Sequence, residues 1–280
     1  MKLLQRLGFV SYDGTTYHGF AKNKQTKTIQ SCIEAVLCTI CKQPAEDLSF
    51  TYSSRTDAGV HALSQPVCFL APDYFPDSTL QTVLNHHLPV SIQFREIKTV
   101  PRDYNLRDSI AMKEYWYVIS ERDQGVVLSQ YCWVLQDFLS NTHLRQIAKV
   151  FCGTHDFRSF AKDAKKYENT ICTIHSISIV PTSEMDTKAA STVDFPLRSL
   201  SGGHIISVIG NRFLHNQIRR MCGFMVHVAT RKTKKDTHFS YSSFDELVAE
   251  NMNATTAKAP AKALYLRKVL LSSRPEEKNP

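Results

Sequence analysis

The fold of this chain is organised around the stretch Ser53-Ser54-Arg55-Thr56-Asp57-Ala58-Gly59-Val60-His61-Ala62. Residues 48–52 before it and 66–70 after it are rich in apolar and hydroxyl side chains, and we expect both to form strands. Asp57 stands among small residues with a glycine two positions later, which is typical of a tight turn that holds a carboxylate toward an open cleft. Arg55 can keep that carboxylate ionised or hold a phosphate beside it.

Spacing alone also fits a surface turn in which Asp57 caps a helix and Arg55 is solvated. However, the string Arg-Thr-Asp-Ala-Gly-Val-His-Ala at 55–62 resembles the signature of the tRNA pseudouridine synthase A family. In that family the aspartate is the catalytic residue, so the resemblance implies that Asp57 is catalytic. The longer string from Ser53 to Ser64 is similar to the eukaryotic branch named tRNA pseudouridine synthase-like 1.

The composition is that of an ordinary globular protein. At 280 residues, with 42% hydrophobic and 21% charged residues, the chain can bury the core of one large domain or two modest ones. A net charge of +8 favours a polyanionic partner. No apolar run reaches the length of a membrane span, and the first nine residues are too short for a secretory signal, so we expect neither a membrane protein nor a secreted one.

The eight cysteines are scattered along the chain. Cys38 and Cys41 form a single C-x-x-C on a predicted helix, without a second pair at zinc spacing, so core thiols are the preferred interpretation over a metal or redox site. Free thiols in turn suggest a reducing compartment. The eleven histidines contain no helical ligand pair such as H-E-x-x-H, and we predict no bound metal.

Two further segments precede the second half of the chain. Residues 12–20, Tyr-Asp-Gly-Thr-Thr-Tyr-His-Gly-Phe, are similar to the family's opening Y-D-G-x-x-Y-x-G-W, with Phe20 in place of tryptophan. A structural turn explains this segment equally well. Thr28 then stands as the predicted N-cap of a helix that continues to about Lys42.

Residues 107–119 resemble the family's A-R-x-S-A-x-x-R-x-Y-x-Y, with Lys113 in place of the second arginine. Alternation places Tyr115 and Tyr117 on one face of a predicted strand. Two core tyrosines are one interpretation. The resemblance implies another, in which Tyr115 is an active-site residue that stacks on the target base.

A long helix is predicted from Asn211 to Ala229, and it would place His215 and Arg219 on one face. Its start resembles the family's F-L-x-x-M-V-R-x-x-x-G. Solvated surface charges are the plain interpretation, whereas the family places the match of Arg219 against the catalytic carboxylate. Three other segments are a mixed polar insertion at 181–203, a basic run at 231–235 and a string at 259–266 similar to the family's closing A-P-x-x-G-L-Y-L.

The resemblance implies an α+β protein with the pseudouridine synthase fold, in which two similar α+β halves join their antiparallel sheets around a central cleft. We assign residues 1–105 to the half that carries the aspartate loop, 106–271 to the half that completes the cleft, and 272–280 to a disordered tail. Members of the family act as homodimers on the anticodon arm of tRNA, so a homodimer and a tRNA partner are expected.

The reaction implied is the isomerisation of uridine to pseudouridine in tRNA, which requires no nucleotide cofactor and no catalytic metal. The target uridine must leave its helical stack, at a cost of about a few kcal/mol. Asp57 would act as nucleophile or as base, with Arg219 as its counter-ion, while Tyr115 stacks on the base and can hand a proton across at C5. Arg55 would fill the vacated place or hold the flipped backbone.

Two other functions fit parts of the pattern. A catalytically inactive RNA-binding protein of the same fold would not need Asp57, Tyr115 and Arg219 together. A hydrolase with a metal bound by Asp57 would need further carboxylates at a recognisable spacing, and the sequence has none. For the compartment, the synthase-like 1 branch suggests mitochondria, and a cytoplasmic location stays open.

Overall fold

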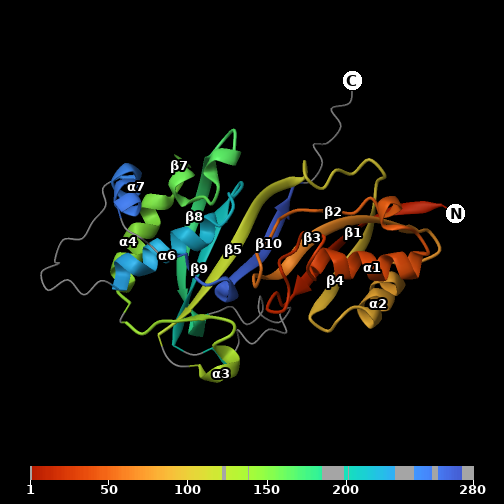
Figure 1. The fold of residues 1–280 in the computed structure, drawn as a ribbon, viewed down its shortest axis with the longest axis horizontal. Helices are drawn as coiled ribbons and strands as arrows, with labels where there is room; N and C mark the ends of the chain where they lie inside the picture. Colours follow the sequence, from red (N-terminus) through yellow and green to blue (C-terminus); the bar gives the residue numbers. More distant parts are fainter. Residues whose placement is uncertain are drawn as a thin grey trace, which may run out of the picture. The chain divides into compact units, whose positions relative to one another are not determined.

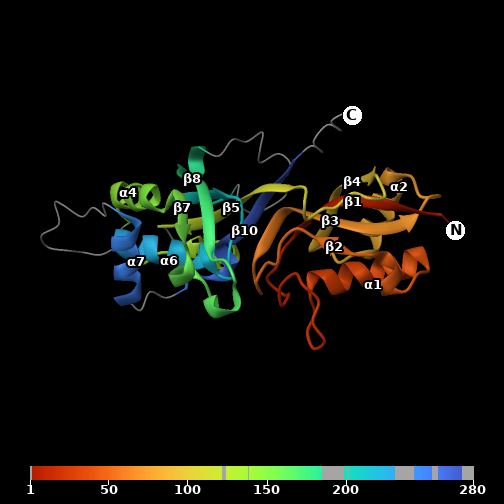
Figure 2. The same cartoon turned by 90° about the horizontal axis from the view of Figure 1, so that it is seen from above.

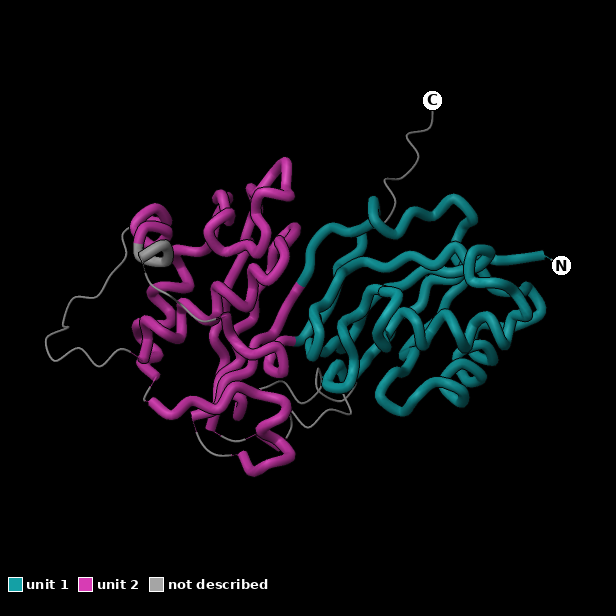
Figure 3. The backbone as a smooth tube through the Cα atoms, in the orientation of Figure 1, with its two compact units in different colours: residues 1–113, 265–280 teal, residues 114–264 magenta. Residues whose placement is uncertain are grey.

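The computed structural model describes residues 2–121, 124–137, 139–184, 199–200, 202–230, 243–253 and 258–272. The chain divides into two compact units, unit 1 with residues 1–113 and 265–280 and unit 2 with residues 114–264 (Figure 3). Each unit contains helices and mostly antiparallel strands, which confirms the α+β class. That the two sheets join around a cleft stays a prediction.

Unit 1 is built on a sheet with the strand order β4-β1-β3-β10, and β2 pairs with β3 (Figure 1). Its strands are β1 (Leu3–Tyr12), β2 (Thr51–Tyr52), β3 (His61–Pro72), β4 (Ile92–Val100) and β10 (Leu264–Leu271). β1 is antiparallel to both β3 and β4, while β10 runs parallel to β3 with Tyr265 opposite His61. This pairing brings the last strand into unit 1, although the sequence-based division assigns it to the second half.

Two helices cover the sheet of unit 1, α1 (Ile29–Cys41) and α2 (Asp77–His87). α1 packs on β3 and α2, and α2 packs on β4. The predicted N-cap is confirmed: the hydroxyl of Thr28 accepts a hydrogen bond from the backbone N–H of Ser31, and the Ser31 hydroxyl accepts one from the N–H of Thr28. α1 ends at Lys42, whose left-handed conformation stops the helix.

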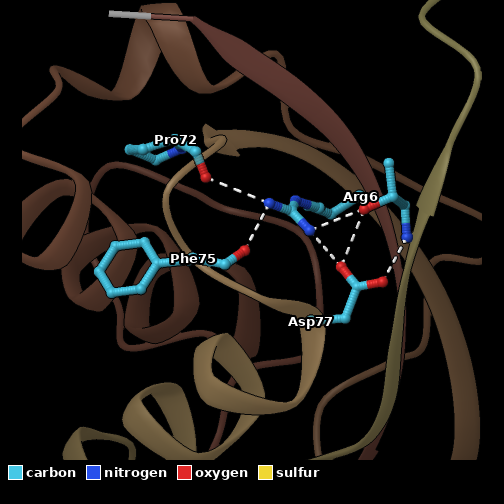
Figure 4. Close-up of polar contacts among 5 residues, drawn as sticks. Arg6, Pro72, Phe75 and Asp77 are labelled. Carbon is cyan, nitrogen blue, oxygen red and sulfur yellow. Dashed lines mark hydrogen bonds and ion pairs between the residues drawn. The ribbon is translucent and has the colours of Figure 1, made fainter.

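A buried arginine ties the far end of β1 to the start of α2 (Figure 4). The guanidinium of Arg6, 2% exposed, forms an ion pair with Asp77 and donates to the carbonyls of Pro72 (3.1 Å) and Phe75 (2.8 Å). Partial burial acts to raise the pKa of Asp77, but hydrogen bonds from Thr99 and Arg6 outweigh it and leave that pKa below its usual value. This cluster therefore stabilises unit 1 at the end of β1 opposite to Tyr12.

The strands of unit 2 follow the order β5-β9-β8-β7, and β6 pairs with β5. Its strands are β5 (Ile110–Ser120), β6 (Trp133–Val134), β7 (Gly153–Asp156), β8 (Ile171–Pro181) and β9 (Gly203–Gly210). β5 begins in unit 1, because the unit boundary falls between Lys113 and Glu114. The boundary predicted at 105/106 thus lies in the segment before this strand.

Among the described residues, the helices of unit 2 are α3 (Gly125–Leu128), α4 (Asn141–Phe151), α6 (Gln217–Thr230) and α7 (Phe244–Asn253). The last three contribute rings to an aromatic core. α4 packs on β8, α6 and α7, and Figure 2 shows these three helices grouped together. The core consists of the rings of Phe151, Phe157, Phe160, Phe224 and Phe244. Phe157 and Phe160, which lie between β7 and β8, therefore serve as packing residues.

Two predicted elements differ in the structure. The strand expected over residues 48–52 is reduced to Thr51–Tyr52, because Leu48 ends a short 3-10 helix and Ser49 is left-handed. The helix expected from Asn211 begins only at Gln217. Asn216 adopts a positive φ of 63°, which interrupts helical geometry. His215 therefore precedes the helix, and the prediction that it shares a helix face with Arg219 is wrong.

Three predicted segments lie largely or wholly outside the described residues. These are the basic run at 231–235, most of the polar insertion at 181–203 and all but Ser272 of the tail at 272–280.

Candidate active site

The loop that carries Asp57 connects β2 to β3, and its base is fixed to β3. The backbone N–H of Ser53 donates to the carbonyl of Pro66 (3.2 Å), and its hydroxyl donates to the side chain of Gln65 (3.1 Å). The amide of Gln65 donates to the carbonyl of Ser54 at 2.6 Å. Ser53 and Ser54 are both buried, so hydrogen bonds shielded from solvent fix the backbone where the chain enters the loop.

The tip of the loop lies against the segment 12–20. The hydroxyls of Tyr12 and Thr56 are 2.7 Å apart, and the N–H of Phe20 donates to the carbonyl of Thr56 at 3.1 Å. The N–H of Gly59 donates to the carbonyl of Tyr17. The segment that resembles the family's opening string thus supports the loop, which agrees with its interpretation as a structural turn.

Two glycines make this close approach possible. A Cβ atom on Gly14 would lie 2.0 Å from the carbonyl oxygen of Val60, so no larger residue fits there without movement of the loop. Gly59 has a φ of 75°, the left-handed region that glycine adopts without strain. The N–H of Val60 donates to the carbonyl of Asp57 at 3.2 Å and closes the turn. The tight turn predicted at Asp57 is confirmed.

Burial differs sharply between neighbouring side chains of the loop. Thr56 and Val60 are buried, Asp57 is half-buried and Arg55 is exposed. The loop thus presents a carboxylate and a guanidinium from a backbone that is fixed on both sides. An ionised carboxylate in such a place can act as a nucleophile or as a base toward a bound ligand.

His61 begins β3 directly after the loop and is completely buried. Its ring stacks on Tyr265 of β10, with 4.7 Å between the centroids, and its Nδ1 lies 3.1 Å from a carboxylate oxygen of Asp13. Burial acts to raise the pKa of Asp13, but hydrogen bonds from His61 and Thr15 outweigh it and hold that pKa well below its usual range. Both residues lie within strings that resemble the family's, which is a signal in the sequence, but the sequence does not show that they pair.

Tyr115 lies on β5 in unit 2 and is 7% exposed. Its ring meets Phe213 edge-on, with 5.3 Å between the centroids and an interplanar angle of 85°. Phe213 belongs to the segment before α6, so two of the family-like strings converge here. The T-shaped contact fixes the orientation of the Tyr115 ring.

Arg219 lies in the first turn of α6 and is 8% exposed. Its Nε donates to the carbonyl of Ala259 at 2.9 Å, and one terminal nitrogen donates to the side-chain oxygen of Asn216 at 3.3 Å. The N–H of Ala259 donates back to the carbonyl of Arg219. The closing string of the sequence thus aims this guanidinium, a role that spacing along the chain did not reveal.

Tyr117, the second tyrosine of β5, is a core residue. It is fully buried, and its hydroxyl donates to the carbonyl of Pro260 at 3.0 Å. Burial raises the pKa of Tyr117 well above its usual value. Since Pro260 follows Ala259, Tyr117 supports the segment that holds Arg219.

The four predicted site residues thus fall into two pairs. Arg55 and Asp57 lie on one loop of unit 1, whereas Tyr115 and Arg219 lie on β5 and α6 of unit 2. That Asp57 and Arg219 meet in one site stays a prediction.

The cysteines fit the interpretation as core thiols in part: five of the eight are buried, whereas Cys32, Cys38 and Cys152 are half-buried. All eight are free, and burial raises the pKa of Cys41 to about 11 and that of Cys68 to about 12. Within the described ranges, no three His, Cys, Asp or Glu side chains are grouped closely enough to hold a metal ion. In the same ranges, every helix is too short or too polar to cross a membrane.

Comparison with known proteins gives a consistent result along nearly the whole chain. A family model described as tRNA pseudouridine synthase matches residues 9–107 and 147–270. The chain is 31% identical over 262 residues to a protein named tRNA pseudouridine synthase A from Pseudothermotoga lettingae, which covers 93% of this chain and 96% of the relative. It is similar to tRNA pseudouridine synthase A 2 from Clostridium tetani, with 31% identity over 93% of this chain and 96% of that protein. It is also 28% identical to tRNA pseudouridine synthase A from Bacillus licheniformis, over 93% of this chain and 96% of that protein.

Proposed function

Since this chain belongs to the tRNA pseudouridine synthase family and isomerises uridine to pseudouridine in tRNA, we propose that Asp57 is its catalytic residue. One observation carries the proposal: Asp57 is a half-buried carboxylate on a loop whose backbone is fixed at its base and at its tip. Such a loop limits the positions that the carboxylate can take, as catalysis requires.

The reaction breaks the bond between N1 of uracil and C1′ of the ribose, turns the base, joins C5 to C1′, and transfers the C5 proton away while N1 takes one up. No atom is gained or lost overall. The carboxylate of Asp57 would attack C1′ as a nucleophile or remove a proton as a base, and either role requires it to be ionised beside the sugar.

The other three residues support this step. We propose Arg219 as the counter-ion that keeps Asp57 ionised, because Asn216 and Ala259 fix the direction of its guanidinium. Tyr115 would stack on the everted uracil, an interaction worth about 1–3 kcal/mol per base. Arg55, exposed on the same loop as Asp57, would occupy the place that the base has left or hold the flipped backbone.

Several finer assignments extend the family membership. We propose that the target uridines lie in the anticodon arm, that the enzyme acts as a homodimer, and that the chain belongs to the eukaryotic branch named tRNA pseudouridine synthase-like 1. The string at 53–64 supports the branch, and the net charge of +8 supports a polyanionic substrate. Eight free cysteines support a reducing compartment, mitochondrial or cytoplasmic.

Asp57→Asn tests the proposal, with Asp47→Asn as a matched change at an exposed aspartate of the same unit. Tritium released from unmodified tRNA labelled at C5 of uridine measures the reaction. We expect Asp57→Asn to lose at least about 1,000-fold in rate while its affinity for tRNA stays within about threefold. Asp47→Asn should behave like the native chain. Tritium release by Asp57→Asn at the native rate would refute the role.

A further inference from the structure

Lys113 connects the start of β5 to the base of the catalytic loop. Its ammonium donates a hydrogen bond to the carbonyl of Ser53 at 2.8 Å, across 60 positions of sequence. We propose that Lys113 is a positioning residue for the isomerisation, and that its cationic donor fixes the loop that places Asp57. This inference rests on the proposed catalytic role of Asp57.

The bond to Lys113 adds to the hydrogen bonds that β3 makes with the base of the loop. The N–H and hydroxyl of Ser53 and the carbonyl of Ser54 are all bonded to β3, through Pro66 and Gln65. The carbonyl of Ser53 points to a different donor, and Lys113 provides it. Ser53 is 8% exposed, so loss of this donor would leave a buried carbonyl without a partner. The loop would then relax toward water or another donor, only four residues before Asp57.

A lysine is a costly choice for this position. Lys113 is half-buried, and burial lowers the pKa of its ammonium to about 8. Among the described residues, no carboxylate lies within ion-pair distance of it, so the charge has no acidic counterpart that would explain it as a stabilising salt bridge. The ammonium of Lys113 makes one short hydrogen bond to the loop. If the carbonyl of Ser53 requires a strong donor on a long side chain, this requirement explains why the free-energy cost of burying the charge is tolerated.

The bond itself defines what position 113 needs. One hydrogen bond to the carbonyl of Ser53 requires a long side chain that ends in a cationic donor, and arginine has both properties. Arginine at 113 should therefore replace lysine with little loss, although its planar group bonds with a different geometry.

Four variants test the proposal in the full chain: Lys113→Met, Lys113→Arg, Asp57→Asn, and Lys268→Met as the same change at an exposed lysine of the same unit. The measurements are the single-turnover rate of tritium release from C5-labelled unmodified tRNA, the dissociation constant for that tRNA, and the melting temperature. We expect Lys113→Met to lose about 30- to 100-fold in rate, because a displacement of about 1 Å has such an effect. Its tRNA affinity should stay within about threefold.

The same measurements separate the outcomes. Lys113→Arg should keep the rate within about threefold of native, and Lys268→Met should match the native chain. A native rate for Lys113→Met, or equal losses in rate and tRNA affinity, would overturn the inference. If Lys113→Met does not fold, Lys113→Gln removes the charge and shortens the reach, and a native rate for that variant would overturn it equally. If Asp57→Asn itself is active, the proposed role of Asp57 fails, whatever Lys113 does.

Discussion

In unit 1, hydrogen bonds from Gln65, Phe20 and Lys113 reach the backbone of the Asp57 loop. In unit 2, hydrogen bonds from Arg219 to Asn216 and Ala259 fix its side chain directly. In the first arrangement the hydrogen bonds fix the backbone of the loop, and the backbone in turn sets the orientation of its side chains. The second fixes a charged group on a rigid helix. A change to the supports of unit 1 should therefore displace a whole loop, whereas a change in unit 2 should affect one guanidinium.

Among changes to the residues that support the two pairs, the largest effect is expected from Gly14→Ala. Its Cβ would lie 2.0 Å from the carbonyl of Val60, a backbone atom that can move only together with the loop. We expect the rate of pseudouridine formation to fall by about 100-fold or more. Gly8→Ala on β1 is the matched control, since its Cβ would meet the ring of Phe94 at 2.6 Å and not the backbone of the loop.

Both glycine variants should lose stability, so rates are compared per folded molecule, with the folded fraction taken from circular dichroism. Equal rates for the two variants would show that the contact between Gly14 and the loop has no bearing on catalysis.

Asp77→Asn should separate stability from activity within unit 1. It leaves the buried Arg6 without its carboxylate, and breaking such a pair costs about 3 kcal/mol. The cluster lies at the end of β1 opposite to the loop, so the rate per folded molecule should not change. Urea denaturation and single-turnover rates test both statements. A rate loss larger than about threefold would mean that the sheet transmits the disturbance to the loop.

Asn216→Gly should have a moderate effect, confined to unit 2. Glycine keeps the left-handed backbone of this position but removes the acceptor for Arg219. We expect a rate loss of about tenfold with little change in the melting temperature, because Ala259 still fixes Nε. A loss as large as that of Gly14→Ala would contradict the distinction between the two units.

A further prediction concerns the pH dependence of stability that Lys113 causes. The pKa of this group is about 8 in the folded chain and 10.5 for an ordinary lysine. Below the folded value, both states bind the proton and the folded chain carries the cost of a buried charge. Between the two values, only the unfolded chain keeps the proton, so rising pH favours the folded state. Relative to Lys113→Met, the native chain should gain stability across this window in urea titrations. If the difference in unfolding free energy between the two proteins did not change with pH, the lowered pKa of Lys113 would be contradicted.

Local chemistry made part of this structure predictable. The turn at Asp57 follows from small residues and Gly59, and the start of α1 follows from Thr28, because both signals act within a few positions. The start of α6 did not follow. There the side chain of Gln217 accepts a hydrogen bond from the N–H of Leu214 and Asn216 is left-handed, so a compact turn replaces the expected helix.

The sequence pattern does not predict hydrogen bonds between segments that are far apart in the chain. Lys113 and Ser53 are 60 positions apart, and Tyr12 and Thr56 are 44 positions apart. Periodicity reports which face of an element is buried, but not which buried polar groups meet. For that reason the motif itself points to Asp57, whereas the residues that hold its loop do not stand out in the sequence.

A crystal structure of the Asp57→Asn variant with unmodified tRNA tests the central claim most directly. The measured quantity is the distance from the side chain at position 57 to C1′ of a uridine turned out of its stack. We predict a separation of about 3–3.5 Å, the range from which the reaction can proceed. A uridine that stays stacked, or a side chain at 57 too remote to touch any ribose, would contradict the account.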